Sequence, residues 1–366
     1  MKNTARIKTP TSTWHWQEPG KAWHGCGIYH LTLSQTDRTE PLLGHLTDSP
    51  TAETATVERT ALGEAIVHCA ANIPHRHPEV RLLQYALMPD HIHLVLQVTR
   101  EMPVGIRSVA RGFWQGCKAA YREWRVSSIA PDSIRNKKQN TEENLFREMP
   151  YIVPLLGRGQ LDRMIRYVHD NPRRAWLKRH NPDLFKMRRE IHIDEGGAHL
   201  TFSAMGNMFL LDWPLKQAVE CSRTIQAEVL AAQKQEVLRN AEQGFVTITA
   251  AMNDGEKAIA QAVREAGFPL VVLLRDGFPA PGSEKEKYFK PQGVYFETCA
   301  AGKLLLLEPK QAVFDDPALY RLTQDDLRHK DELKHRDYSP LPTDSTRYRC
   351  VALNNMGRLL AQNFMQ

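Results

Sequence analysis

The sequence predicts an α+β fold, with an antiparallel sheet and covering helices in the first half and a small α/β domain in the second. Two apolar runs, VRLLQYALM and HIHLVLQV, are divided by a Pro-Asp pair that suits a tight turn, which predicts an antiparallel strand pair. A strongly amphipathic helix is predicted at residues 103–125. From Phe245 onward, apolar strands alternate with helical segments, which is typical of a small parallel sheet covered on both faces.

The remaining elements of the first half follow from local periodicity. Residues 27–34, GIYHLTLS, alternate like a strand, and residues 35–54 are expected to form a loop. Residues 54–73 carry apolar side chains four positions apart, which predicts a helix. Residues 159–180 predict a helix that is broken at Asn171–Pro172 and then resumes.

The second half predicts a regular alternation of elements. Strands are expected in GFVTITA, PLVVLLRDG and KLLLLEP, and helices in NDGEKAIAQAVREAGF and GVYFETCAAG. These elements divide the chain into an antiparallel-sheet domain (1–192), a linker with a helix (193–244), the α/β domain (245–312), and a charged linker with a C-terminal helix (313–366).

Composition limits the class of protein. The N-terminus has no apolar signal region and the apolar runs are short, so neither a signal peptide nor a membrane span is expected. Six scattered cysteines without a C-x-x-C pair favour a cytoplasmic protein without structural disulfides or a zinc knuckle. The net charge of +6 is unevenly spread, because residues 1–200 carry +7 and residues 201–366 carry −1, and a basic block lies at 157–189. Such a block indicates either a polyanionic partner or a solvated surface.

Two histidines stand on the second strand of the predicted pair. Residues two apart on a strand face the same way, about 7 Å apart, so His91 and His93 share the face opposite to the apolar one. They are close enough to bind one metal ion together, although two strand histidines can also be satisfied by neighbouring side chains. A second H-x-H, His75 and His77, lies between prolines and is expected in a loop.

A tyrosine and an asparagine stand four residues apart on a later helix. Tyr167 and Asn171 lie on one flank of an apolar stripe and can be presented together to a sheet. That stripe consists of Leu161, Met164, Ile165 and Val168. Two structural roles stay open: Tyr167 as a boundary aromatic with its hydroxyl in water, and Asn171 as the N-cap of a helix that begins at Pro172.

In order and spacing, LMPDHIHLVLQV and GQLDRMIRYVHDNPRRAWLKRHNPDLF resemble the single-tyrosine HUH transposases, and among them the REP-associated tyrosine transposases. The resemblance covers roughly residues 23–190 and implies a ferredoxin- or RRM-like sheet acting on single-stranded DNA. It implies His91, His93 and Asn171 as metal ligands and Tyr167 as the nucleophile. Asp90 stands where the family often has Asn; it either acts beside the metal or closes the turn.

The resemblance implies a metal-dependent endonuclease and strand transferase that forms a 5′-phosphotyrosine on single-stranded or hairpin-associated DNA. Nitrogen and oxygen ligands without a thiolate favour Mg²⁺ or Mn²⁺. A tyrosine with a pKa near 10 is mostly protonated at neutral pH and needs the metal or a base nearby. The alternative is a domesticated single-stranded or hairpin DNA-binding protein without transposition activity. A third hypothesis places the function in a phosphate-binding C-terminal domain.

Basic side chains on two predicted helices are candidates for phosphate contacts. They are Arg107, Arg111, Lys118, Arg122, Arg163, Arg166, Arg173 and Arg174. For the first four, DNA contact and a solvated helix face are equally compatible with the pattern. The last four flank Tyr167, which favours DNA contact. Trp114 and Trp176 fit either stacking platforms for unpaired bases or core packing, and a homodimer is compatible with the sequence.

The second half loosely resembles the Rossmann-like domains of the DNA-processing protein A and lysine-decarboxylase-like group. The turn Asn253–Asp254–Gly255 opens a helix whose N-terminus, with Lys257 nearby, could receive a phosphate. A structural loop is the simpler interpretation, and without a full glycine fingerprint no cofactor-binding residue is predicted.

Overall fold

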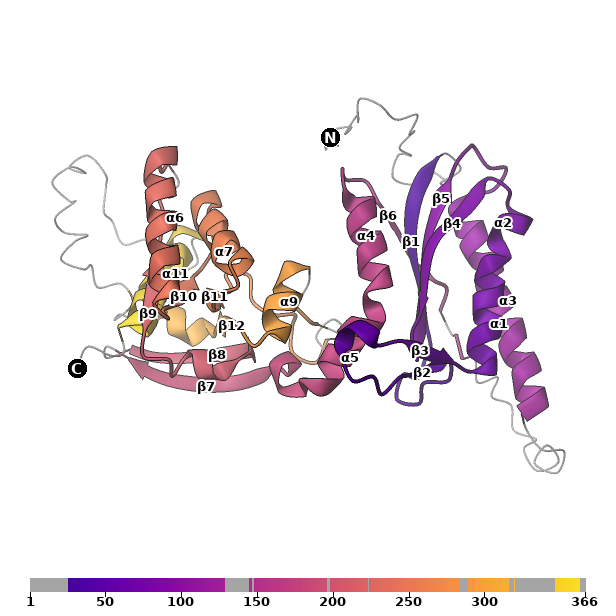
Figure 1. The fold of residues 1–366 in the computed structure, drawn as a ribbon, viewed down its shortest axis with the longest axis horizontal. Helices are drawn as coiled ribbons and strands as arrows, with labels where there is room; N and C mark the ends of the chain where they lie inside the picture. Colours follow the sequence, from indigo (N-terminus) through magenta and orange to yellow (C-terminus); the bar gives the residue numbers. More distant parts are fainter. Residues whose placement is uncertain are drawn as a thin grey trace. The chain divides into compact units, whose positions relative to one another are not determined.

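A computed structural model of the chain forms two compact units, Met1–Leu177 and Lys178–Gln366 (Figure 1). It describes residues 26–128, 145–146, 148–195, 198–222, 224–283, 289–291, 293–315, 319 and 346–362. Most of the charged linker expected after residue 312 lies outside these ranges. None of the helices in the described ranges is both long and apolar enough to cross a membrane.

The first unit contains a four-stranded antiparallel sheet. Its strands are β1 (Gly27–Ser34), β4 (Val80–Leu87), β5 (His91–Val98) and β6 (Tyr151–Pro154), in the order β4-β5-β1-β6. Helix α1 (Ala61–Ala71) connects β1 to the β4-β5 pair, and α3 (Ile106–Ser128) connects β5 to β6. This βαββαβ order is the ferredoxin-like arrangement that the sequence resemblance implies. The predicted strand pair around Pro89–Asp90 is confirmed.

Alternation along the strands separates two faces of this sheet. Leu31 of β1 and Leu94 and Leu96 of β5 are fully buried against Ile66 of α1 and Phe113 of α3. The intervening residues of both strands point to the other face, where α4 (Gln160–His169) lies. Figure 1 shows α1 and α3 on one side of the sheet and α4 on the other. The side chains of one strand therefore serve a core on one face and a site on the other.

Three predictions for the first unit need correction. The expected loop at 35–54 contains β2 (Gly44–Leu46) and the short 3₁₀ helix η1 (Ala52–Thr54), and β2 pairs with β3 (Val57–Arg59). The helix expected from residue 54 therefore begins only at Ala61, after Thr60, whose hydroxyl accepts a hydrogen bond from the Gly63 N–H. The His75 segment is the one-turn helix α2 (Ile73–Arg76) rather than a loop, because Pro74 suits a first helical turn.

The predicted helix break in residues 159–180 is confirmed. Helix α4 ends at His169, α5 (Asn171–His180) begins two residues later, and a 3₁₀ turn, η3 (Pro182–Phe185), follows. Val168 is fully buried, and it packs with Leu161 and Met164 against Val95 of β5. The apolar stripe therefore holds α4 on the sheet face that carries the histidines.

The second unit contains a six-stranded mixed sheet in the order β7-β8-β12-β11-β10-β9. The strands are β7 (Arg188–Glu195), β8 (Ala198–Gly206), β9 (Lys216–Val219), β10 (Val246–Thr249), β11 (Leu270–Leu273) and β12 (Leu304–Pro309). Neighbours among β9 to β12 are parallel, whereas β8 is antiparallel to β12 and β7 to β8. The strands expected within 245–312 are thus present.

The segment 193–244 is more than the expected linker with a helix. It supplies β8 and β9 to the sheet, and β7 crosses the expected boundary at residue 192. In β8, Leu200, Phe202 and Ala204 alternate into the core of the unit, but Ser203 between them is also buried, which weakens the sequence pattern. The expected parallel sheet is therefore extended by two antiparallel strands.

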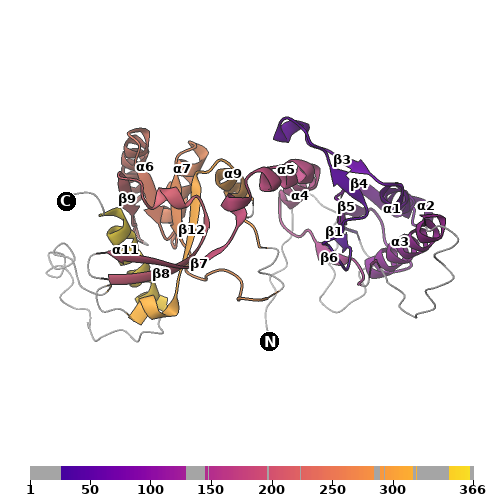
Figure 2. The ribbon, with the colours of Figure 1, turned by 90° about the horizontal axis from the view of Figure 1, so that it is seen from below.

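Helices cover both faces of the second sheet (Figure 2). They are α6 (Ala227–Glu242), α7 (Asp254–Glu265), α9 (Val294–Ala300) and α11 (Thr346–Ala361), with short 3₁₀ turns η4 (Met208–Leu210) and η5 (Gln311–Asp315). Leu353 and Met356 of α11 are fully buried with Ile248 of β10 and Leu273 of β11. The predicted final helix is therefore part of this core.

Candidate active site

Two neighbouring strands place four polar side chains on the face that α4 partly covers. His91 and His93 come from β5, and His30 and Thr32 come from β1. Thr32 lies directly opposite His93 in the antiparallel register, and His30 lies opposite Val95. Cross-strand neighbours on one face have Cβ atoms about 5 Å apart, so pairing in this register brings the polar groups into contact.

The two histidines of β5 aim the same ring atom at each other. The Nε2 atoms of His91 and His93 are 3.2 Å apart, and the rings are nearly perpendicular, at 85°. Each Nδ1 atom has a protein partner on the other side. Nδ1 of His91 lies 2.5 Å from a carboxylate oxygen of Asp90, and Nδ1 of His93 lies 3.0 Å from both Thr32 Oγ1 and His30 Nε2. The Nε2 atoms are thus left to converge on one point.

Asp90, in the turn between β4 and β5, contacts His91 through one carboxylate oxygen. Its second carboxylate oxygen is paired with the guanidinium of Arg38, a residue of the loop after β1. Burial raises the pKa of Asp90, but the hydrogen bonds from His91 and Arg38 outweigh it and hold that pKa well below the usual value. A carboxylate at Nδ1 favours the tautomer of His91 in which Nε2 carries the lone pair, and the Arg38 guanidinium also lies 3.2 Å from Nδ1.

The two inner histidines are neutral. His93 is 6% exposed and His30 is 9% exposed. Burial, and then the charge of His91, lower the pKa of His30 to about 4. Burial, followed by the neighbouring His91, His30 and Arg38, lowers the pKa of His93 well below its ordinary value. Neutral imidazole is the form that binds a metal.

Helix α4 brings Tyr167 to this cluster. Its ring centroid lies 5.7 Å from that of His93 and 6.5 Å from that of His30. The side chain is 38% exposed, so it faces the histidines and remains open to solvent. The guanidinium of Arg174 lies 5.4 Å from the Tyr167 ring centroid on the α5 side. The structure therefore brings together three of the four residues that the sequence resemblance selects.

Asn171 has a different environment from the one that N-capping predicts. Helix α5 begins at Asn171 itself, and the side-chain amide donates to the carbonyl oxygens of Tyr167 (2.8 Å) and Val168 (3.4 Å) at the end of α4. The side chain thus satisfies carbonyls of the preceding helix. Among the described residues none donates a hydrogen bond to Oδ1, and no described contact joins Asn171 to either histidine of β5.

The donor set fits a divalent cation. The Nε2 atoms are 3.2 Å apart, and a proton or a cation between them removes the repulsion between two imidazole lone pairs. A protein partner on each Nδ1 atom is the usual support for a metal-binding histidine. Among the residues that the structure describes, no group of three or more His, Cys, Asp or Glu side chains is arranged to hold a metal. A site here would consist of two imidazoles completed by amide or water oxygens.

The candidate DNA-binding residues fall on different faces of the first unit. Arg163 and Arg166 are exposed on α4, the helix that carries Tyr167. Arg173 is paired with Asp170 at 2.7 Å, and Arg174 stacks on Tyr167. The other four lie on α3, which packs against the opposite face of the sheet: Arg107, Arg111, Lys118 and Arg122. The structure therefore separates the α3 set from the site.

Sequence reasoning did not select His30, Thr32 or Arg38. A signal for the first two was present, because they alternate with the apolar residues of GIYHLTLS and must share a face. What the sequence did not reveal is that β1 pairs with β5 in the register that sets Thr32 against His93. Arg38 follows β1 in a loop, so only the tertiary structure shows its contact with Asp90.

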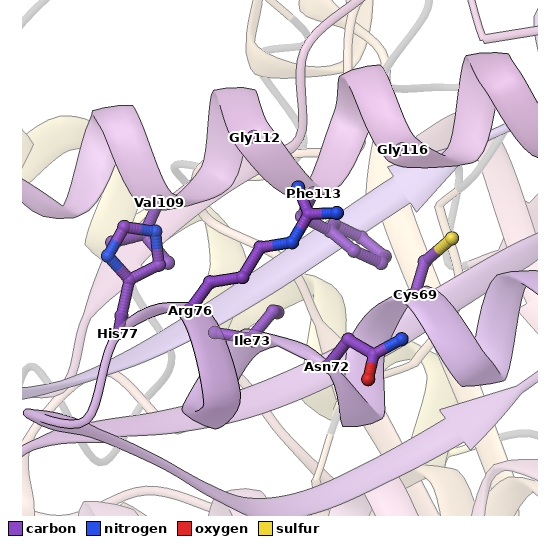
Figure 3. Close-up of a pocket in the computed structure, with 9 residues that line it drawn as sticks. All are labelled: Cys69, Asn72, Ile73, Arg76, His77, Val109, Gly112, Phe113 and Gly116. Carbon is purple, nitrogen blue, oxygen red and sulfur yellow. The ribbon is translucent and has the colours of Figure 1, made fainter.

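The first unit also has a cavity of about 120 Å³ between α1, α2 and α3 (Figure 3). It is lined by Cys69, Arg76 and His77 and by the helical glycines Gly112 and Gly116, among others. These helices pack on the sheet face opposite the histidines, so the cavity is not part of the candidate active site.

The candidate phosphate position in the second unit is filled by the chain. At the start of α7, the Asn253 side chain accepts a hydrogen bond from the Glu256 N–H, and the buried Glu256 carboxylate accepts one from Met252 N. A Cβ on Gly255 would lie 3.1 Å from Cys221 Cβ, so the 221 loop covers this turn. The turn is therefore structural.

Comparisons with known proteins find distant similarities. No family model matches the chain. An uncharacterised protein of Haemophilus influenzae is 26% identical over 76 residues, or 21% of this chain, and the match spans only 38% of that relative's length. The structure of a REP-associated tyrosine transposase bound to a REP hairpin is similar over 43% of this chain and 73% of the transposase chain, with 13% identity and a TM-score of 0.28. A Deinococcus radiodurans protein named as a candidate transposase is similar over 42% of this chain and 97% of its own chain, with 14% identity and a TM-score of 0.24.

Proposed function

We propose that this chain is a metal-dependent single-stranded DNA endonuclease and strand transferase of the single-tyrosine HUH type, acting on hairpin-associated DNA. One observation carries the proposal. The Nε2 atoms of His91 and His93 converge at 3.2 Å beside the ring of Tyr167. Phosphodiester cleavage of this kind needs a metal ion and a tyrosine nucleophile side by side. Two candidate metal-binding histidines on a strand and a tyrosine on a later helix would supply both.

The residues that would hold the metal are His91 and His93 through Nε2, with Asn171 Oδ1 as the third candidate. Mg²⁺ or Mn²⁺ suits these nitrogen and oxygen donors. When bound, the cation would polarise a phosphodiester and offset its developing charge. Asp90 and Thr32 orient the two imidazoles, and the low pKa of His93 keeps its ring neutral.

Tyr167 supplies the nucleophile. Its Oη forms a bond to the phosphorus as the bond from phosphorus to the 3′ oxygen of the leaving strand breaks. The phenolic proton is lost and the 3′ oxygen gains one, which leaves a 5′-phosphotyrosine and a free 3′-hydroxyl. Because one phosphodiester replaces another, a second 3′-hydroxyl can reverse the step, which gives strand transfer. Exposed Arg163 and Arg166 on the same helix are placed to contact neighbouring phosphates.

Detection of a covalent adduct tests the proposal. Labelled hairpin DNA with single-stranded flanks of random sequence is incubated with the protein and Mn²⁺ and analysed after denaturation. The wild type is expected to give a denaturation-resistant labelled band. Tyr167→Phe is expected to bind the DNA with no band, whereas Tyr121→Phe, on α3 at the opposite face, is expected to retain it.

The alternative function is an outcome of the same experiment. Binding of the hairpin pool without an adduct from the wild type, with either Mg²⁺ or Mn²⁺, identifies a DNA-binding protein without cleavage activity. A band that persists in Tyr167→Phe contradicts the assignment of the nucleophile.

A further inference from the structure

Tyr151 is an exposed aromatic residue at the edge of the histidine-bearing sheet. It is the first residue of β6, the outer strand next to β1, and 73% of it is exposed. Neither a hydrogen bond nor a ring contact joins its side chain to another of the described residues. An aromatic ring this open on a sheet face has apolar surface available for a ligand.

The strand register places Tyr151 on the same face as the candidate active site. Tyr151 lies directly opposite Thr32 of β1, and Thr32 lies directly opposite His93 of β5. The Thr32 hydroxyl contacts His93, which fixes its side chain on the histidine face. The next residue of β6, Ile152, packs against the core on the other face. At a strand spacing of about 4.8 Å, Tyr151 and His93 are about 9.5 Å apart across the sheet.

The covering helix leaves this part of the face accessible. Helix α4 packs against β4 and β5, so Tyr167 reaches the histidines from the β4 side. Tyr151 lies at the opposite edge of the sheet, on β6 beyond β1. The histidine pair therefore lies between two aromatic residues, one of which is the candidate nucleophile. A polymer bound at the histidines and Tyr167 would extend across β1 toward Tyr151.

The two tryptophans considered as stacking platforms are engaged elsewhere. Trp114 donates its Nε1–H to the Phe146 carbonyl and packs against the core opposite the histidines. Trp176 donates its Nε1–H to the Ser49 carbonyl. Both tryptophans are only partly exposed, whereas Tyr151 is exposed on the histidine face.

We propose that Tyr151 is a stacking platform for an unpaired nucleobase of the DNA strand whose phosphate is held at His91 and His93. The proposal rests on the function proposed above and adds a base-binding position to it. Every base has a π-face, so stacking of this kind tolerates sequence and selects single-stranded over paired DNA. The base would lie within a few nucleotides of the scissile phosphate, because Tyr151 and His93 are two strands apart.

Equilibrium binding of fluorescent hairpin DNA with single-stranded flanks tests this proposal. It is measured in a Tyr167→Phe background, in which cleavage is absent. Tyr151→Ala is expected to weaken binding about 5- to 150-fold, since base–aromatic stacking contributes about 1–3 kcal/mol. Tyr151→Trp is expected to keep the affinity. The matched control is Phe209→Ala, which removes another exposed aromatic ring, 77% exposed, from the second unit. This variant is expected to leave the affinity for the DNA unchanged.

Abasic nucleotides locate the stacked base. An abasic position is moved along the flanks of the hairpin, one nucleotide at a time. At one or two positions, the abasic DNA is expected to bind more weakly than intact DNA to the protein that has Tyr151. The Tyr151→Ala variant is expected to bind the abasic and the intact DNA with equal affinity. Non-additivity of this kind reports a direct contact, whereas a general loss of affinity does not.

The outcomes distinguish the stacking role of Tyr151 from the proposed cleavage activity. Unchanged binding by Tyr151→Ala, or an abasic penalty that persists in Tyr151→Ala at every position, overturns the stacking role even if the wild type forms the covalent adduct. Stacking without an adduct from the wild type overturns the cleavage activity and retains the base-binding role. No binding of single-stranded DNA by the wild type overturns both.

Discussion

The Nε2 atoms of His91 and His93 lie 3.2 Å apart, and the Nδ1 atom of each ring contacts different protein groups. Asp90 holds the outer ring, and Thr32 with His30 holds the inner ring. Two rings oriented independently onto one point would form a preorganised ligand pair, because little side-chain freedom would be lost on binding a cation.

Removal of either imidazole is expected to weaken metal binding. In the Tyr167→Phe background, His91→Ala and His93→Ala should each weaken Mn²⁺ binding at least tenfold, because half of the converging donor pair is removed. Isothermal titration calorimetry or Mn²⁺ electron paramagnetic resonance measures this. The matched control is the second H-x-H: His75→Ala and His77→Ala lie near α2 and should leave Mn²⁺ affinity unchanged. An equal loss in all four variants would contradict the site.

Asp90→Asn tests the support of His91. The substitution keeps the size of the side chain but removes the charge that fixes the Nδ1–H tautomer, so Mn²⁺ affinity should fall about 10- to 100-fold. Arg38→Gln should have a smaller effect, since it leaves the Asp90 carboxylate on His91 Nδ1 while removing the guanidinium that contacts both Asp90 and His91. The exposed Asp162→Asn on α4 is the control for loss of one negative charge. If Asp90→Asn and Asp162→Asn change the Mn²⁺ affinity equally, Asp90 does not support His91 and only closes the turn.

The two sets of basic residues should differ in their effect on DNA binding. Arg163→Ala and Arg166→Ala are expected to lower affinity for single-stranded DNA and to reduce the slope of log K against log salt by about 0.7 for each phosphate that is no longer neutralised. Arg107→Ala and Arg111→Ala should leave the slope unchanged, because α3 packs on the opposite face of the sheet. Salt titrations by fluorescence anisotropy measure both. A reduced slope in the α3 variants would show that DNA reaches that face.

Two helical glycines should respond to alanine with opposite signs. A Cβ on Gly63 of α1 would lie 1.9 Å from the Leu43 carbonyl oxygen, so Gly63→Ala should destabilise the first unit by about 1–3 kcal/mol. A Cβ on Gly112 of α3 meets nothing within 4 Å. Gly112→Ala should therefore stabilise by about 0.5–1 kcal/mol, the gain expected from helix propensity. Urea denaturation followed by tryptophan fluorescence measures both, and equal signs would contradict the packing around Gly63.

Thiol reactivity should distinguish the cysteines of the first unit. A hydrogen bond from Cys117 lowers the pKa of Cys69, and this outweighs the opposing effect of burial. Burial raises the pKa of Cys117 well above the usual value. Since the thiolate is the reactive form, iodoacetamide at about pH 8 should label Cys69 before Cys117, and the Cys69 rate should fall as the pH is lowered.

Peptide mass spectrometry over time measures this order of labelling, with Cys69→Ser as the control that removes the early product. Cys299 of the second unit offers a further comparison, because burial raises its pKa to about 12. Its labelling should also lag behind that of Cys69. Early labelling of Cys117 would show that the cavity beside α1 and α3 opens more widely than the structure indicates.

Local periodicity determined most of the elements of this protein. The alternation of HIHLVLQV fixed which face of β5 is apolar, so the sequence alone placed His91 and His93 on one side of a strand. The spacing of the apolar residues of α4 likewise presented Tyr167 beside the buried stripe. Signals of this kind lie within one element, and they are readable because each element has its own period.

Short strands and caps were harder to read. The pair β2-β3 has three residues in each strand, too few to show a period, and the helix expected from residue 54 was therefore placed too early. In β8 a buried serine interrupts the apolar alternation, so the segment was expected to be part of a linker. In both cases pairing with a distant strand outweighs a weak local pattern.

Only the tertiary structure decided what the histidines contact. The register that sets Thr32 against His93, the loop that brings Arg38 to Asp90, and the turn of Asn171 toward the end of α4 all depend on segments far apart in sequence or on side-chain direction. Periodicity gives the face of an element but not its neighbour or its register, because those follow from how several elements pack at once. The sequence alone therefore selected His91, His93 and Tyr167, whereas the contacts of His30, Thr32 and Arg38 with this cluster became visible only in the tertiary structure.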